Sequence, residues 1–168
     1  VDMLSNKVAL VRGGYEFNGD PIVSFDSERV YEVLNSWKNK VDSIAVIGVF
    51  SALNNDQEKK VEEIAKAILG PTVPVSLSST IGSVGLIQRE NATILNAALI
   101  KVIKRVSSGF AAALNEYGIT QATPYLCQND GTLMSLDFAT KYPILTIGSG
   151  PTNSIRGAAY LSKQKNAM

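Results

Sequence analysis

The chain has 168 residues, of which 45% are hydrophobic and 18% are charged, and its formal net charge is +1. This balance is typical of a globular protein of one domain, or of one domain with a small satellite, and it excludes a disordered chain and a strongly basic nucleic-acid-binding surface. Because the chain has no histidine and a single cysteine, zinc sites with histidine ligands, serine–histidine triads and an internal disulfide are excluded as well.

The first part of the chain predicts a hairpin followed by a helix. Residues 7–11 form an apolar run typical of a strand, and Asn18-Gly19 is a strong turn signal before a returning strand over residues 21–25. Asp26 or Ser27 is expected to cap the helix. Its inward face is predicted from apolar residues at helical spacing: Val30, Val33, Leu34 and Trp37.

Strands and helices continue to alternate over residues 43–77. Residues 43–50 are continuously apolar and rich in β-branched side chains, as expected for a strand buried on both faces. The run Asn54-Asn55-Asp56 is expected to cap a second helix, which Gly70 ends. Its predicted inward residues are Val61, Ile64, Ala65 and Ile68. Residues 73–77 predict a further strand, in which Pro74 indicates an edge or a strand beginning.

The longest predicted element is a helix over residues 90–117, which Gly118 ends. Its apolar stripe is broad: Ile94, Leu95, Ala98, Leu99, Val102, Ile103, Val106, Phe110 and Leu114. A stripe of this width predicts a central helix packed on two sides. Gly109 inside the helix predicts a close contact or a bend.

The remaining residues predict two strands, a short helix and a final helix. Residues 124–128 are expected to form a strand that carries Cys127 into the core, followed by an Asn129-Asp130-Gly131 turn. Ser135 is expected to cap a short helix that runs through Thr140. Pro143 is predicted to open a last strand, which leads through a glycine turn into a helix.

The alternation places the chain in the α/β class, with a mainly parallel or mixed sheet and packed helices. The Gly70-Pro71-Thr72 break is the one candidate hinge. It divides the chain into portions 1–70 and 73–168.

The glycine turn Gly148-Ser149-Gly150-Pro151, with Thr152 after it, is the strongest binding candidate. A strand, a glycine turn and a helix direct free N–H groups and the positive end of a helix dipole at an anion. Pro151 suits the first helical position, and Ser149 or Gly150 can cap. The turn lacks the third glycine of a dinucleotide fingerprint and the lysine of a P-loop, so an ordinary strand-to-helix connection is the alternative.

A second candidate is Asn129-Asp130-Gly131, because α/β sheets bind ligands at the carboxyl ends of their strands. The alternative is a turn that uses these residues for local hydrogen bonding.

The remaining candidate binding residues are two arginines, Arg89 with its neighbours and Arg156. Arg89-Glu90-Asn91 precedes the predicted long helix, and Glu90 or Asn91 either caps that helix or contacts a substrate or partner subunit. Arg156 either neutralises an anion or forms a structural ion pair. No metal-ligating cluster is predicted.

Four segments resemble, in order along the chain, the hydantoinase A/5-oxoprolinase family and its hydantoin-utilisation branch. They are VALVRGGYEFNGD (8–20), VPVSLSSTIGSVGLIQRENATILNAAL (73–99), YLCQNDGTL (125–133) and SGPTNSIRGAAYLS (149–162). The SGP turn and the RENATILNAA segment are the most specific parts of this resemblance.

The resemblance implies an ATP-dependent enzyme that opens cyclic amides such as hydantoins and 5-oxoproline, or a related carboxylase subunit that activates ketones with ATP. It also implies an actin/hexokinase-like (ribonuclease H-like) ATPase fold with two phosphate loops of the type Asp-x-Gly-Gly-Thr. This sequence contains neither loop. The resemblance therefore identifies it as a fragment lying between the two loops, with Ser149–Thr152 lining a cleft near nucleotide or substrate oxygens.

The expected function is thus that of a fragment of a cyclic-amide hydrolase. The alternative is a non-catalytic scaffold or assembly module of such an enzyme or of the carboxylase. The parent enzyme is expected to bind ATP and Mg²⁺, whereas the fragment alone is expected to bind no cofactor. Expected partners are a cyclic amide, the rest of the parent chain, and a second subunit type or further copies. Neither nucleic acid nor membrane is expected, and the lone cysteine favours a cytoplasmic location.

Overall fold

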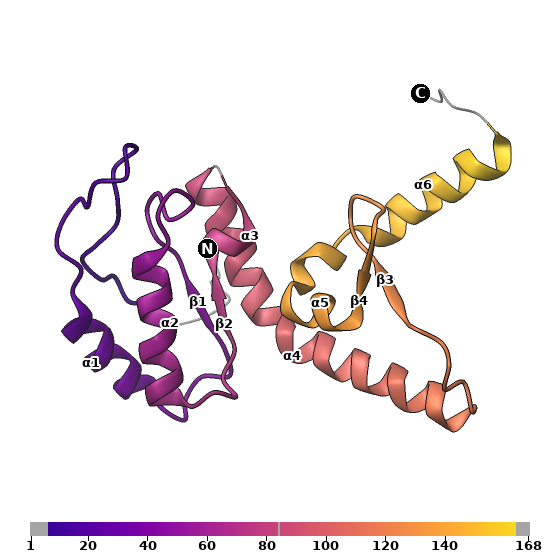
Figure 1. Ribbon diagram of the computed structural model, residues 1–168, viewed down its shortest axis with the longest axis horizontal. Helices are drawn as coiled ribbons and strands as arrows, with labels where there is room; N and C mark the ends of the chain where they lie inside the picture. Colours follow the sequence, from indigo (N-terminus) through magenta and orange to yellow (C-terminus); the bar gives the residue numbers. More distant parts are fainter. Residues whose placement is uncertain (1–6, 84, 164–168) are drawn as a thin grey trace. The chain divides into compact units, whose positions relative to one another are not determined.

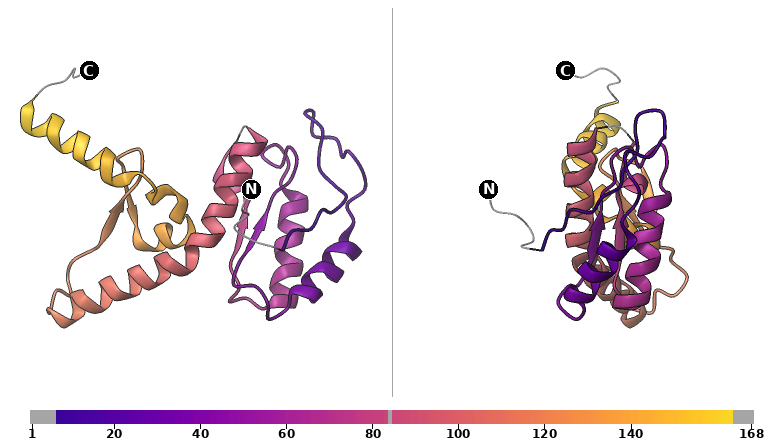
Figure 2. Two further views of the ribbon diagram at one scale, coloured as in Figure 1. Left: turned by 180° about the vertical axis from the view of Figure 1, so that it is seen from behind. Right: turned by 90° about the vertical axis from the view of Figure 1, so that its left-hand side faces the viewer.

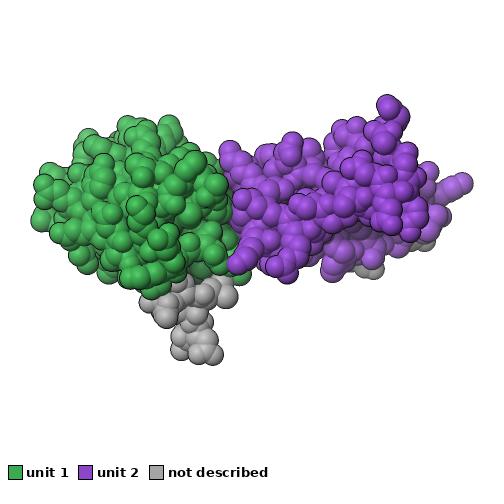
Figure 3. Space-filling view, turned by 90° about the horizontal axis from the view of Figure 1, so that it is seen from below, with its two compact units in different colours: residues 1–98 green, residues 99–168 purple. Residues whose placement is uncertain are grey.

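The computed structural model describes residues 7–83 and 85–163. They fall into two units, residues 1–98 (unit 1) and residues 99–168 (unit 2), coloured separately in Figure 3. Helix α4 (Leu86–Glu116) begins in unit 1 and continues into unit 2 (Figure 1).

Unit 1 is built around a strand–helix–strand motif. Its elements before α4 are α1 (Ser27–Trp37), β1 (Ile44–Val46), α2 (Asp56–Leu69), β2 (Val75–Leu77) and α3 (Ser78–Ile81). Strands β1 and β2 pair in parallel, with Ile44 opposite Val75 and Val46 opposite Leu77. Parallel pairing is possible because α2 forms the crossover between the two strands. Helices α1 and α2 lie side by side (Figures 1 and 2).

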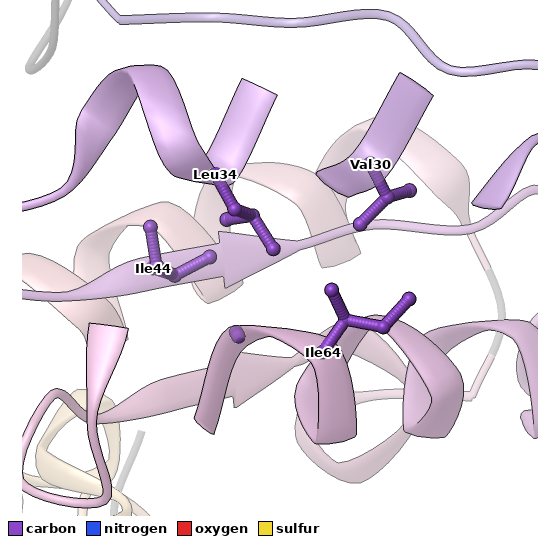
Figure 4. Close-up of a cluster of buried hydrophobic side chains, with 5 residues drawn as sticks. Val30, Leu34, Ile44 and Ile64 are labelled. Atoms are coloured by element: carbon purple, nitrogen blue, oxygen red, sulfur yellow. The ribbon is translucent and has the colours of Figure 1, made fainter. Parts of the chain in front are cut away.

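The core of unit 1 confirms the apolar faces predicted for both helices. Val30 and Leu34 of α1 and Ile64 of α2 are buried around Ile44 of β1 (Figure 4). Trp37 is half-buried and packs against the same cluster. These contacts remove apolar surface from water, which stabilises the unit by about 25 cal/mol per Å² of buried area.

The helix ends in unit 1 follow local chemistry. The Asp26 side chain accepts a hydrogen bond from the Arg29 N–H at 2.9 Å and so caps α1, as predicted. At α2, Asn54 Oδ1 accepts from the Asp56 N–H at 3.1 Å, whereas Asn55 occupies the cap position without a side-chain bond. Gly70 ends α2 at φ 95°, a conformation that glycine adopts without strain.

Three strand predictions in unit 1 need correction. Residues 7–11 form no strand, because they have no ladder partner among the described residues. The predicted hairpin is reduced to its turn and one bridge between Tyr15 and Pro21. The strand predicted over residues 43–50 ends at Val46, since charged side chains occupy the N–H and C=O groups of Gly48. The strand predicted over residues 73–77 begins at Val75, just after Pro74. Pro74 therefore marks the beginning of the strand, one of the two positions predicted for it.

Unit 2 packs a β-hairpin and the short helix that follows it around Ile103 of α4. After α4 come β3 (Tyr125–Cys127), β4 (Leu133–Ser135), α5 (Leu136–Lys141), the 3-10 helix η1 (Pro143–Thr146) and α6 (Ser149–Ser162). Strands β3 and β4 pair antiparallel. The core contains Ile103 of α4, Met134 of β4 and Ala139 of α5, and Leu126 and Leu145 pack against it. Ser135 caps α5 by accepting from the Phe138 N–H at 3.2 Å, as predicted.

The segment before α6 differs from its prediction. Pro143 opens a 3-10 helix and not a strand, so the strand–turn–helix arrangement is wrong. Gly148 occupies the cap position of α6 at φ 81°, in place of Ser149 or Gly150. Pro151 is the third residue of the helix and not the first.

The long helix also corrects two predictions. Because α4 begins at Leu86, residues 89–91 lie inside it and do not cap it. Packing on two sides is contradicted by Val102, Val106 and Phe110, which are exposed. A Cβ atom added at Gly109 would meet nothing within 4 Å, so no close contact explains that glycine.

The mixed α/β class with packed helices is confirmed, but the described residues form one parallel and one antiparallel two-stranded sheet in place of the single mainly parallel or mixed sheet that was predicted. Cys127 is half-buried and not fully in the core. Within the described ranges, none of the helices combines the length and the apolar character that crossing a bilayer demands.

Candidate functional site

Two segments that the sequence singles out meet in unit 2. The Thr152 hydroxyl, in the first turn of α6, donates to the backbone carbonyl of Asn129 at 2.7 Å. The Asn129 N–H donates to the carbonyl of Leu145 at 2.8 Å, which also fixes the turn to η1. We call this arrangement the turn–helix site; it consists of Asn129, Asp130, Gly131, Ser149, Gly150, Pro151, Thr152 and Arg156.

Asp130 forms a closed local turn with Thr132. Its Oδ1 accepts from the Thr132 N–H at 2.8 Å and from the Thr132 hydroxyl at 2.7 Å. The side-chain bond, then the backbone bond, lower the pKa of the Asp130 carboxyl below its ordinary value, and the charge of Arg156 adds a smaller effect in the same direction. Asp130 therefore presents a carboxylate to solvent at neutral pH.

The Arg156 side chain lies against the backbone of Gly131. The φ of Gly131 is +84°, and an added Cβ would lie 2.5 Å from Arg156 Cδ and 2.7 Å from Nη1. The positive φ favours glycine here, whereas the exposed end of the Arg156 side chain is flexible enough to move aside. The guanidinium of Arg156 thus lies beside the turn that carries the Asp130 carboxylate.

The start of α6 offers two backbone donors. Gly148 provides no side-chain cap, and Pro151 has no N–H. The first N–H of the helix with an acceptor is that of Thr152, which reaches the Gly148 carbonyl at 3.5 Å. In the described part of the chain, the N–H groups of Ser149 and Gly150 meet no acceptor, so they remain available at the positive end of the helix dipole.

These features give the site opposite charges at short range. The helix start and Arg156 favour an anion or a carbonyl oxygen, whereas Asp130 favours a hydrogen-bond donor. A ligand with both an acceptor oxygen and an N–H would use the two halves of the site.

Arg89, Glu90 and Asn91 belong to unit 1, whereas the residues of the turn–helix site belong to unit 2. Arg89 is only 5% exposed, and its guanidinium donates to Ser78 Oγ at 3.0 Å, to the Gly48 carbonyl at 2.7 Å and to the Ser83 carbonyl at 3.2 Å. Glu90 and Asn91 are exposed on α4.

The partner of Arg89 in this network is a residue that the sequence did not indicate. Glu58 is 2% exposed, and its carboxylate accepts from the Gly48 N–H at 2.8 Å, from Ser78 Oγ at 2.6 Å and from the Ser79 N–H at 3.0 Å. Ser78 thus connects the two buried charges. The network ties the loop after β1, at Gly48, to α3 and to Ser83 between α3 and α4.

The described residues do not fit a magnesium site. Within ranges 7–83 and 85–163, no three carboxylate, cysteine or histidine side chains lie close enough together to hold a metal ion. Mg²⁺ needs oxygen ligands in octahedral geometry, usually one or two carboxylates with waters and phosphate oxygens. A single exposed Asp130, whose Oδ1 is already bonded to Thr132, does not supply that set.

Comparison with known proteins gives two family matches. Residues 1–69 match the hydantoinase/oxoprolinase N-terminal region, and residues 89–168 match hydantoinase/oxoprolinase. The chain is 25% identical over 150 residues to an uncharacterized protein of Methanocaldococcus jannaschii. The aligned residues make up 89% of this chain and 22% of that protein. It also shares its fold with an acetone carboxylase in a nucleotide-free structure, with a TM-score of 0.71 and 23% sequence identity. The match covers 91% of this chain and 22% of the acetone carboxylase chain. The chain therefore spans about a fifth of the length of each of these relatives.

Proposed function

The chain belongs to the hydantoinase/oxoprolinase family, and on that basis we propose that it forms part of an ATP-dependent enzyme that opens cyclic amides of the hydantoin or 5-oxoproline type. Because the chain spans 22% of each relative, the activity is assigned to a longer polypeptide that contains these residues. We further propose that this polypeptide is cytoplasmic and acts as an oligomer or with a second type of subunit.

The observation that carries a role for this chain is the hydrogen bond between Thr152 and Asn129, which joins the acidic turn to the start of α6. The proposed role is to form one wall of the ligand site. The N–H groups of Ser149 and Gly150, with the guanidinium of Arg156, would bind a ligand oxygen that carries or develops negative charge. The Asp130 carboxylate would accept a hydrogen bond from a ring N–H.

ATP, when bound by the longer polypeptide, would supply the phosphoryl group that activates a ring amide oxygen. The turn–helix site would orient the ring through these hydrogen bonds. No step is assigned to Mg²⁺ in this chain, because the described residues do not provide its ligands.

The test is ATP hydrolysis by the longer polypeptide with and without hydantoin or 5-oxoproline. Arg156→Ala is expected to raise the substrate KM by roughly tenfold, equivalent to about 1.4 kcal/mol of binding. Arg105→Ala, which removes an exposed cation from α4, serves as the matched control and should leave KM unchanged. If neither cyclic amide stimulates ATP hydrolysis, the proposed ring-opening reaction is wrong. If the two variants have equal KM values, the turn–helix site does not bind the substrate.

Similarity of fold to an acetone carboxylase favours a second candidate, a ketone carboxylase subunit. ATP hydrolysis stimulated by acetone and bicarbonate, and not by cyclic amides, would select it. The alternative of a non-catalytic assembly module predicts that substitutions in the turn–helix site change neither KM nor kcat.

A further inference from the structure

A tight turn over residues 16–20 closes the loop that precedes α1. The Glu16 N–H donates to the Asp20 carbonyl at 2.7 Å, and the Gly19 N–H donates to the Glu16 carbonyl at 3.0 Å. Asn18 and Gly19 at its tip are the single Asn-Gly pair of the sequence. Gly19 has φ +90°, and an added Cβ there would meet nothing within 4 Å. The turn therefore needs glycine for its backbone conformation alone and leaves space around the pair.

An asparagine that precedes glycine can react with its own backbone. The Gly19 nitrogen attacks Cγ of Asn18, so that a C–N bond forms and the bond from Cγ to Nδ2 breaks. Ammonia leaves with the proton that the backbone nitrogen loses, and a cyclic succinimide remains. Water then opens the succinimide at either carbonyl, which gives aspartate or isoaspartate. Because the attack is intramolecular, its rate depends on how freely the two groups approach each other, and Gly19 has no side chain to hinder them.

The folded turn binds the Asn18 amide at both ends. Asn18 is exposed, and its Oδ1 accepts from the Asp20 N–H at 3.0 Å, while its Nδ2 donates to Asp20 Oδ2 at 2.8 Å. Negative charge develops on Oδ1 when the backbone nitrogen adds to Cγ, so an N–H already directed at that oxygen stabilises the transition state.

One hydrogen bond opposes the reaction. The attacking nitrogen donates to the Glu16 carbonyl, and this bond must open before the nitrogen can reach Cγ. It lies in a short turn whose other residues, Phe17 and Asn18, are exposed. Backbone bonds in such exposed turns open at low free-energy cost, so the bond slows the attack without preventing it.

A second exposed asparagine of unit 1 lacks this combination. Asn39 lies in the turn after α1 at φ 59°, and it is followed by Lys40. The side chain of Lys40 hinders the backbone nitrogen that would attack Asn39. Asn39 therefore provides a comparison within the same molecule, equal in exposure and different in the residue that follows.

The product would alter a loop that is anchored beside β1. Tyr15 is 6% exposed, and its N–H donates to the Val49 carbonyl at 3.1 Å. Isoaspartate adds a carbon atom to the backbone between residues 18 and 19. The two backbone bonds that close residues 16–20 then cannot both keep their length and angle. Either product also places a new carboxylate beside that of Asp20.

We propose that Asn18 is a site of spontaneous deamidation, through a succinimide formed with the nitrogen of Gly19, and that the isoaspartyl product opens the turn over residues 16–20. The modification is independent of the cyclic-amide reaction, because it uses only the atoms of this turn and water.

The test is incubation of the 168-residue chain at mildly alkaline pH, followed by mass spectrometry of its peptides. Deamidation is read from the mass difference between –OH and –NH₂, and isoaspartate from labelling by an isoaspartyl methyltransferase. Asn18 should convert at least roughly tenfold faster than Asn39, equivalent to a barrier lower by about 1.4 kcal/mol. Gly19→Ala should slow conversion of Asn18 by a similar factor and leave the rate at Asn39 unchanged.

The same chain unfolded in urea is the reference for the effect of the fold. If Asn18 stays intact in the folded chain while it converts in urea, the turn protects the residue and the proposal is wrong. Equal rates at Asn18 and Asn39 in the folded chain would also overturn it. Hydrogen exchange in the peptide that spans residues 15–22 should be faster in the isoaspartyl fraction, and unchanged exchange would reject the opening of the turn.

Discussion

Gly131 is the residue on which the geometry of the turn–helix site depends most directly. Its left-handed φ closes the turn, and the absence of a side chain lets Arg156 lie against its backbone. Gly148 has a similar φ of +81° but open space around it, so it is required for its conformation alone. Gly131 therefore meets both a backbone conformation and a close neighbour, whereas Gly148 meets a backbone conformation only.

Gly131→Ala is expected to lower the free energy of unfolding of unit 2 by about 1–2 kcal/mol, because alanine is strained at positive φ and displaces the arginine. Urea unfolding followed by circular dichroism measures this change. Gly157→Ala is the control: its added Cβ meets nothing within 4 Å, so stability should hold or rise by up to about 1 kcal/mol. Equal stability of the Gly131 variant and the unaltered chain would contradict the proposed packing of Arg156.

Among single residues, those with local roles were the predictable ones. The Asn129-Asp130-Gly131 turn could be predicted because the bonds that shape it, from Thr132 to Asp130 and from Gly131 to Gln128, are made within three residues. The bonds of Asn129 to Leu145 and Thr152 are long-range and could not be predicted. Glu58 could not, because its burial depends on Gly48, Ser78 and Ser79, which only the folded chain brings to it. An acidic residue in the first turn of a helix otherwise indicates no more than a favourable dipole contact.

At the scale of elements, the network of Glu58, Ser78 and Arg89 ties α2, α3 and α4 to the loop after β1. Both charges are almost fully removed from water. Ser78 Oγ bonds to both charged side chains, at 2.6 Å to Glu58 and at 3.0 Å to Arg89, so the loss of either one leaves buried polar groups of the network unpaired, which costs free energy.

Glu58→Gln should therefore lower the free energy of unfolding by about 3 kcal/mol, because the amide nitrogen would oppose another donor and Arg89 would lose the carboxylate to which Ser78 connects it. Differential scanning calorimetry checks this value. Glu32→Gln removes a carboxylate from an exposed ion pair with Arg29 at 3.0 Å and should change stability by no more than about 0.5 kcal/mol. Similar effects of the two substitutions would mean that the Glu58 network is solvated.

The helices were predicted far better than the strands, for a physical reason. Helices α1, α2 and α5 are set by caps and spacing that lie within their own sequences. The apolar runs at residues 7–11 and from Pro143 have the composition of strands, but a strand exists only with a ladder partner elsewhere in the chain. Strand β4 was not predicted, because three residues with one buried side chain, Met134, give no detectable alternation.

At the scale of the whole molecule, the first family region and the first structural unit end at different residues. The match to the N-terminal region ends at residue 69, whereas unit 1 extends to residue 98. The interval between them supplies β2, the parallel partner of β1, and the first half of α4. The Ser43 hydroxyl donates to the Ala97 carbonyl at 2.8 Å, which ties β1 to that helix.

A chain of residues 1–98 is accordingly expected to fold cooperatively, whereas a chain of residues 1–70 is expected to remain largely unfolded. The shorter chain lacks the partner of β1 and leaves Glu58 without Ser78 and Arg89. Dispersion of amide resonances in nuclear magnetic resonance spectra distinguishes the two states. A well-dispersed spectrum from the 1–70 chain would show that β2 and α4 are dispensable to the unit.

The half-buried Trp37 gives the two units different optical properties. It is the single tryptophan of the chain, and it packs against the core of unit 1, whereas unit 2 carries only tyrosine and phenylalanine as aromatic residues. Selective excitation of indole emission therefore reports on the first unit alone. When a titration with denaturant is followed by this emission and by tyrosine absorbance together, separation of the two curves would reveal that the units melt independently.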